Sequence, residues 1–154
     1  MSPKLTNVSP FSVTGISVRT INRDEFNPTT AKLPNLWARF YGNGVTGQVP
    51  NQAPGSSVFG VYSDYESDAT GFYSVTAGMA TSGPTSSEFT TVSIEEGRYL
   101  VFENRGPMPQ AVIDTWGIIW AYFENNTEFI RSYTTDFEEY RGPDQIAIHI
   151  GVRG

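Results

Sequence analysis

The chain has 154 residues, no cysteine and one histidine, which excludes disulfides, thiolate zinc sites and histidine-rich metal sites. The formal net charge of −6, from 10 basic and 16 acidic residues, argues against nucleic acid as a direct partner. Residues 1–10 contain no apolar run, and no stretch approaches the roughly 18 apolar residues of a membrane span. We therefore expect a cytoplasmic protein with no membrane partner and no cofactor.

Aromatic residues dominate the apolar part of the sequence, which has 10 Phe, 8 Tyr and 3 Trp but only four leucines. Aromatic rings bury a large area and present a negative face to cations. An acidic, aromatic-rich domain therefore suits flat or cationic organic ligands. Composition alone leaves an alternative, in which a β-rich core uses these rings for packing.

The first half of the chain predicts one strand, one helix and a hairpin. Residues 11–21 alternate or are β-branched, which is typical of a strand. A helix is predicted to begin at Leu33 and to end at Gly42 or Gly44, because its apolar residues recur on one face and glycine commonly follows a helix end. Two strand-like runs, 57–65 and 72–80, flank an acidic turn and predict a hairpin.

The second half repeats the same order. Its best-defined element is a helix at 108–124, where Trp116, Ile119, Trp120 and Phe123 belong to one apolar stripe. Strands are predicted at 89–94, 99–103, 129–133, 136–140 and 145–152. The repeat is joined near residues 81–87.

Strands that outnumber helices in this order predict an α+β domain with two main helices and about eight strands. Neither half is large enough to be stable alone, so we treat 1–154 as a single domain. The two repeats cover about 9–80 and 88–154.

Two patterns resemble functional sites without completing them. Asp64, Glu66 and Asp68 have the spacing of a calcium loop, but the glycine comes late and no closing glutamate follows, so we expect a solvated hairpin tip. His149 lies in a predicted strand on the face opposite the isoleucines. No nucleophile elbow accompanies it, which favours a surface or hydrogen-bonded histidine.

The segment 133–140 is more informative. In a strand, Asp136 and Glu138 face one side, and Phe137 and Glu139 face the other. One glutamate therefore points inward if either face is covered, and a carboxylate among aromatic rings is costly unless it is paired. Such a residue can serve to capture a cation; the alternative is a fully exposed edge strand.

Several short segments occur in a recognisable order over nearly the whole chain. They are residues 13–16, 36–40, 61–66, 71–73, 77–78, 97–102, Trp116 and 136–140. In these segments the chain resembles the GyrI-like, AraC-type effector-binding domain family. It also resembles stand-alone members of that family, including integron-cassette proteins that bind cationic drugs.

The resemblance implies duplicated β-α-β-β units related by a pseudo-twofold axis, with an antiparallel sheet and a ligand cleft between the halves. It also implies one acidic residue in the final hairpin that meets a cationic ligand. The D-F-E-x-Y pattern places this residue at Glu138. A change of one residue in register would bring Glu139 into the same place.

We accordingly predict a non-catalytic binding module for lipophilic, planar organic cations. Trp37 represents the helix of the first half, and Trp116 and Trp120 represent the helix of the second. The predicted ligand-binding residues are Glu138, Trp37, Phe59, Tyr73, Trp116 and Trp120, and Tyr62 is an alternative to either Phe59 or Tyr73.

The same resemblance implies two alternative functions. Some GyrI-like proteins resemble hydrolases of cyclopropane-type electrophiles, in which Glu138 would act as a general base beside Tyr99 or Tyr140. Others present a surface that inhibits a partner protein. A regulatory role for this chain would require a protein partner, because the sequence contains no DNA-binding segment; a homo-oligomer is a further possibility.

Overall fold

The computed structural model describes residues 3–68, 70–82, 89–125 and 128–153, which form an α+β fold. Eight antiparallel strands make one open sheet in the order β1-β6-β8-β7-β3-β4-β2-β5. The strands are β1 (Lys4–Val8), β2 (Phe11–Ile21), β3 (Val58–Ser63), β4 (Phe72–Thr81), β5 (Thr90–Ile94), β6 (Gly97–Arg105), β7 (Ile130–Gly142) and β8 (Gln145–Arg153).

The strand order shows the duplication expected from the sequence. Strands β1 to β4 of the first half correspond to β5 to β8 of the second. When each strand is replaced by its counterpart, the same strand order is obtained, read from the opposite edge of the sheet. A pseudo-twofold axis therefore passes between the central strands β3 and β7. Each half also supplies an edge strand to the other, because β1 pairs with β6 and β5 pairs with β2.

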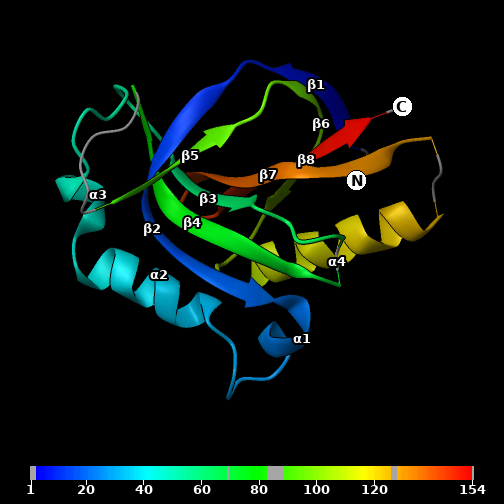
Figure 1. The fold of residues 1–154 in the computed structure, drawn as a ribbon, viewed down its shortest axis with the longest axis horizontal. Helices are drawn as coiled ribbons and strands as arrows, with labels where there is room; N and C mark the ends of the chain where they lie inside the picture. Colours follow the sequence, from blue (N-terminus) through cyan, green and yellow to red (C-terminus); the bar gives the residue numbers. More distant parts are fainter. Residues whose placement is uncertain (1–2, 69, 83–88, 126–127, 154) are drawn as a thin grey trace.

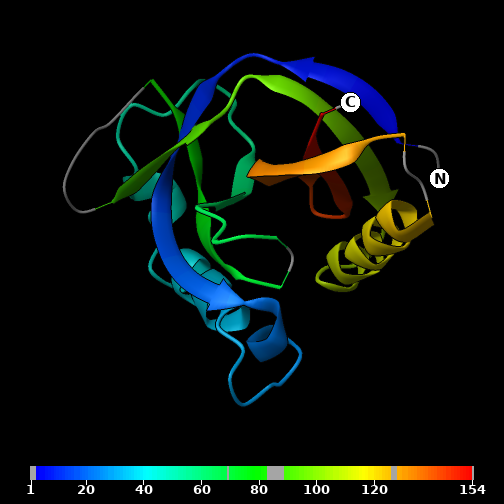
Figure 2. The same ribbon diagram turned by 45° about the vertical axis from the view of Figure 1, so that its right-hand side comes forward.

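Two long helices, α2 (Leu33–Gly42) and α4 (Gln110–Asn125), lie on the same side of the curved sheet (Figure 1, Figure 2). Their apolar faces bury Leu36 and Phe40 in one cluster and Ala111 and Ile119 in another. Two shorter helices, α1 (Asn22–Glu25) and α3 (Val45–Gln48), flank α2. None of the described helices is both long and apolar enough to cross a membrane.

The other face of the sheet has a core of its own. Strand alternation turns the side chains of Phe59, Tyr99 and Phe137 away from the helices. They pack with Val13 and Ile94 in a third buried cluster. Both faces of the middle of β7 are therefore covered, and its polar side chains Thr135, Asp136 and Glu138 are buried.

Most predicted elements are present, with three differences. Strand β1 was not expected, because residues 4–8 lack an apolar pattern; this edge strand is held by backbone pairing to β6. Helices α1 and α3 are single turns in segments for which the sequence predicted neither a helix nor a strand. The runs 129–133 and 136–140 belong to one strand, interrupted by a register shift between Arg131 and Asp136.

Two further sequence expectations concern the connector at 81–87 and the acidic segment at 64–68. The connector predicted at 81–87 lies outside the described residues from position 83 onward. The acidic segment at 64–68 follows β3 as a turn, as expected. No group of three or more metal-ligating side chains occurs within the described parts of the chain, at this turn or elsewhere.

Candidate functional site

A cavity of about 960 Å³ lies between α2 and α4, against the helix-covered face of the sheet. This volume is near the upper end of the range for small-molecule sites. Most of its large lining side chains are aromatic. They are Phe26, Trp37, Tyr41, Tyr62, Tyr65, Tyr73, Trp116, Trp120 and Tyr140. The cavity therefore combines both halves of the duplicated fold.

Glu138 lies at the base of this cavity, and its residue is only 2% exposed. Three neutral donors hold its carboxylate. The Tyr62 hydroxyl and the Trp116 indole Nε1 donate to Oε2, at 2.9 and 2.8 Å. The Tyr140 hydroxyl donates to Oε1 at 2.9 Å. The three donors come from β3, α4 and β7, so the carboxylate joins the sheet to the second-half helix.

Burial and hydrogen bonding act on Glu138 in opposite directions. Burial raises the pKa of the Glu138 carboxyl, because the charged form loses its hydration. The three hydrogen bonds oppose that increase, since their donors favour the carboxylate. The pKa remains above the ordinary glutamate value, and the phenol pKa values of Tyr62 and Tyr140 are raised well above theirs. These phenols therefore remain neutral donors at any physiological pH.

No basic side chain of the described residues neutralises this carboxylate, because none forms an ion pair with Glu138. Arg131 also lines the cavity, but its guanidinium binds Asp136 at 2.7 Å and lies over the Tyr133 ring at 4.4 Å. Asp136 in turn accepts from the backbone N–H of Gly151. Arg131 is therefore held by a buried carboxylate of its own.

Aromatic contacts build the cavity walls on both sides of Glu138. Trp37 meets Tyr140 edge-on, with ring centroids 5.2 Å apart. On the opposite side, Trp116 contacts Tyr62 at 5.1 Å and Trp120 at 6.2 Å. These distances are typical of favourable aromatic pairs. The ring faces left toward the cavity are available to a flat or cationic ligand.

Gly60 makes the space that Glu138 occupies. The two residues are directly paired across β3 and β7. A Cβ atom at position 60 would lie 2.8 Å from Oε1 of Glu138 and 3.0 Å from Cζ2 of Trp37. A side chain here would push the carboxylate or the indole out of place. Sequence reasoning missed this residue, although a glycine inside a predicted strand often marks a close approach.

The structure brings five of the six predicted site residues together. Glu138, Trp37, Tyr73, Trp116 and Trp120 all line the cavity. Phe59 is placed on the other face of the sheet, where its ring packs against Phe11 and Phe137.

The misplacement of Phe59 has a simple cause. Alternation along β3 turns Val58, Gly60 and Tyr62 toward the helices, and it turns Phe59 away. Tyr62, which the sequence offered as an alternative, occupies the place expected for Phe59. The same alternation separates the two glutamates: Glu139 leaves the cavity and pairs with Arg141 at 2.9 Å.

The tyrosines considered for hydrolysis are also separated. Tyr140 contacts Glu138, whereas Tyr99 lies on the opposite face and bonds Thr135 and the carbonyl of Glu95. His149 is on that face too, and it is buried rather than exposed. A Glu138–Tyr140 pair is thus the arrangement that a hydrolytic mechanism could use.

Comparison with known proteins gives a consistent result. A family described as integron-associated effector-binding proteins matches residues 4–152. The integron cassette protein VCH_CASS2, from the mobile metagenome of Vibrio cholerae, is 40% identical with a TM-score of 0.86, covering 99% of this chain and 96% of its own. YobU of Bacillus subtilis (strain 168), a candidate transcriptional regulator, is 28% identical over 133 residues, which are 82% of this chain and 78% of YobU.

A more distant structure shares the fold. SAV2435, solved with bound tetraphenylphosphonium, has a TM-score of 0.78 and 19% identity, and the match covers 100% of this chain and 95% of SAV2435.

Proposed function

The chain belongs to the family of integron-associated effector-binding proteins, and we propose that its effector is a lipophilic organic monocation with aromatic groups. The ligand would occupy the cavity between α2 and α4, with its charge near Glu138 and its rings against the aromatic walls. Binding is the function proposed, without chemical change to the ligand.

The observation that carries this proposal is the unpaired Glu138 carboxylate. It is buried, it accepts from three neutral donors, and it has no cationic partner among the described residues. A carboxylate in such surroundings is costly, and a bound cation relieves that cost. The surrounding ring faces add attraction for the same charge. A neutral ligand of the same shape would gain only the apolar contacts.

The ligand of SAV2435 supports the same chemical class. Tetraphenylphosphonium is a monocation whose charge is surrounded by four phenyl rings, and SAV2435 shares this fold. The volume of about 960 Å³ leaves room for a molecule of that size. The ligand of this chain need not be the same compound, since the identity between the two proteins is low.

A matched pair of ligands and one variant test the proposal. Methyltriphenylphosphonium and triphenylphosphine oxide have nearly the same shape, but only the first is charged. Isothermal titration should show that the wild type prefers the cation. Glu138→Gln should weaken cation binding by about 2–5 kcal/mol, the usual cost of removing one partner of a buried charge pair. Oxide binding should change little.

Glutamine is nearly isosteric with glutamate, so the variant should retain the fold, and circular dichroism provides that control. Equal losses for both ligands would contradict charge recognition, as would no loss for either.

The hydrolase hypothesis remains a second candidate because Tyr140 donates directly to Glu138. A base and a phenol in contact can move a proton to or from water. The distinguishing measurement is product analysis with a cyclopropane-type electrophile. Conversion that disappears in Glu138→Gln would support hydrolysis, whereas recovery of the intact electrophile would support binding alone.

A further inference from the structure

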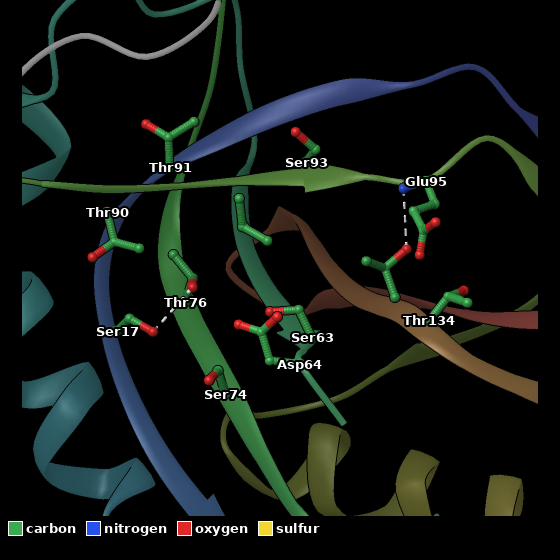
Figure 3. A pocket seen from close by; sticks show the side chains of 12 residues that line it. Ser17, Ser63, Asp64, Ser74, Thr76, Thr90, Thr91, Ser93, Glu95 and Thr134 are labelled. Atoms are coloured by element: carbon green, nitrogen blue, oxygen red, sulfur yellow. Dashed lines mark hydrogen bonds between the residues drawn. The ribbon is translucent and has the colours of Figure 1, made fainter. Parts of the chain in front are cut away.

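A second cavity, of about 330 Å³, opens on the helix-free face of the sheet (Figure 3). Its lining is almost entirely hydroxyl-bearing or acidic, with Val92 as the apolar exception. The lining residues are Ser17, Ser63, Asp64, Ser74, Thr76, Thr90, Thr91, Val92, Ser93, Glu95, Thr134 and Thr135. Its character is therefore opposite to that of the aromatic cavity.

Strand alternation separates the two cavities. Ser17 in β2 and Thr76 in β4 alternate with Val18 and Val75, whose side chains pack in the cluster beneath α2. Ser63 likewise points away from the side that carries Tyr62. The sheet thus stands between the two cavities, and a ligand in one does not contact a ligand in the other.

One hydroxyl that lines the second cavity has no hydrogen-bond partner among the described residues. Ser63 is 5% exposed, and its hydroxyl makes no hydrogen bond with any part of the chain that the structure describes. Its neighbours are satisfied, since Thr76 donates to Ser17 at 3.2 Å and Thr135 contacts the Tyr99 hydroxyl at 2.7 Å. Solvent reaches this hydroxyl through the cavity, so a ligand can bond Ser63 in place of water.

Two carboxylates that line this cavity form no ion pair with any side chain in the described part of the chain. Figure 3 shows Asp64 directly after Ser63, and Glu95 across the opening beside Thr134. Arg19 lies beside Asp64 and donates to its carbonyl at 2.7 Å and to the Ser74 hydroxyl at 3.1 Å. Arg19 thus binds backbone and hydroxyl oxygens. Two negative charges against one positive charge favour a cationic ligand and disfavour an anion.

We infer that this second cavity binds a small polyol that carries a protonated amine, of about the size of one amino sugar. Several ligand hydroxyls would exchange hydrogen bonds with the serines and threonines, each of which can donate and accept. The ammonium group would lie between Asp64 and Glu95. The lack of aromatic lining excludes the ring-bearing cations proposed for the other cavity.

Three monosaccharides of similar size test this inference: glucosamine, glucose and glucuronate. In NMR titrations, amide shifts at Ser63, Thr76 and Thr134 should saturate in the order glucosamine first, glucose second and glucuronate last. Methyltriphenylphosphonium should not displace glucosamine, because the two sites lie on opposite faces of the sheet.

Variants identify the responsible groups. Asp64→Asn and Glu95→Gln should each weaken glucosamine binding about fivefold, the effect of a partly exposed ion pair. Asparagine tolerates the left-handed backbone of Asp64, whose φ is 51°. Ser63→Ala should weaken glucosamine and glucose equally. Glu96→Gln is the matched control and should change nothing, because Glu96 does not line the cavity.

Equal affinity for the three sugars, an equal loss in Glu96→Gln, or displacement by methyltriphenylphosphonium would overturn the inference. Because Glu138→Gln leaves the second cavity intact, failure at one site is distinguishable from failure at the other.

Discussion

Glu138 and His149 lie on opposite faces of the paired strands β7 and β8, and both are more than nine-tenths buried. Burial moves both toward the neutral form, so the pKa of Glu138 is raised and that of His149 is lowered to about 4. Their partners differ. Glu138 accepts three hydrogen bonds beside a cavity, whereas His149 stacks on Phe137 at 4.2 Å and its Nδ1 has no hydrogen-bond partner within the described ranges.

The difference shows that burial alone does not identify a site. His149 packs as an aromatic ring, and its charged form is excluded by the surrounding core, with Glu139, Arg141 and Glu103 as the nearest charged groups. Glu138 keeps donors that favour its charged form, together with a cavity in which a counter-charge can be placed. His149 therefore contributes to the core, whereas Glu138 lines the cavity in which we propose that the ligand binds.

The largest expected effect is on the pH dependence of stability, and it comes from replacing His149 with a side chain that does not titrate. The ordinary histidine pKa is 6.5 and that of His149 is about 4, so the unfolded chain binds the proton more readily between these values. Stability from this residue is therefore present above pH 6.5 and is lost as pH falls toward 4, by about 3 kcal/mol. His149→Phe should abolish that part of the acid destabilisation.

Urea unfolding of wild type and His149→Phe at pH 7 and pH 4 measures this difference. Phenylalanine preserves the ring stacking on Phe137, so the difference between the two proteins reports the titration of His149. An equal decline in both proteins on acidification would show that His149 does not titrate as described.

A smaller effect is expected from filling the space at Gly60, which is paired with Glu138 across β3 and β7. Gly60→Ala puts a methyl group 2.8 Å from the Glu138 carboxylate and 3.0 Å from Trp37, so one of them must move. Overpacking of this kind lowers the free energy of unfolding by about 1–3 kcal/mol. We expect a loss of about 2 kcal/mol in methyltriphenylphosphonium affinity by isothermal titration.

Gly117→Ala is the control for that substitution, because its added methyl group meets nothing within 4 Å. It should leave the affinity unchanged. Wild-type affinity in Gly60→Ala would mean that the position of the carboxylate is not important for binding.

The smallest effect concerns one donor to Glu138. Trp116→Phe removes the indole N–H that donates to Oε2. The pKa of Glu138 should then rise further, because this hydrogen bond favours the carboxylate, and the pH midpoint of cation binding should move upward with it. Trp120→Phe is the matched variant, since Trp120 donates no hydrogen bond to Glu138; a similar shift in both would point to a general loss of packing.

Sequence patterns predicted the elements that have a strong period or clear ends. The predicted start of helix α2 and one of its two predicted ends, Gly42, match the structure, and the predicted 108–124 differs from α4 by two residues at its start and one at its end. Strand β1 was missed because an exposed edge strand is held by backbone bonds and needs no apolar pattern. The register shift in β7 was missed because it depends on the partner strand β8.

The candidate site was predictable where a residue type is informative by itself. A glutamate between aromatic residues predicted Glu138, and the resemblance to a known family favoured it over Glu139. The sequence of β3 did not determine which of its side chains face the helices, since Phe59 and Tyr62 are both large and apolar enough to face inward. The contribution of Gly60 depends on pairing across the pseudo-twofold axis, which no local pattern contains.

The ionisation of Glu138 is the central claim, and carbon-13 NMR of its side-chain carboxyl measures it directly. In the free protein, the carboxyl should titrate above the ordinary glutamate pKa, because burial outweighs its three hydrogen bonds. With saturating methyltriphenylphosphonium, the pKa should fall, since a nearby cation favours the carboxylate, and cation affinity should rise with pH through the same range. The same pKa with and without the cation would contradict the account.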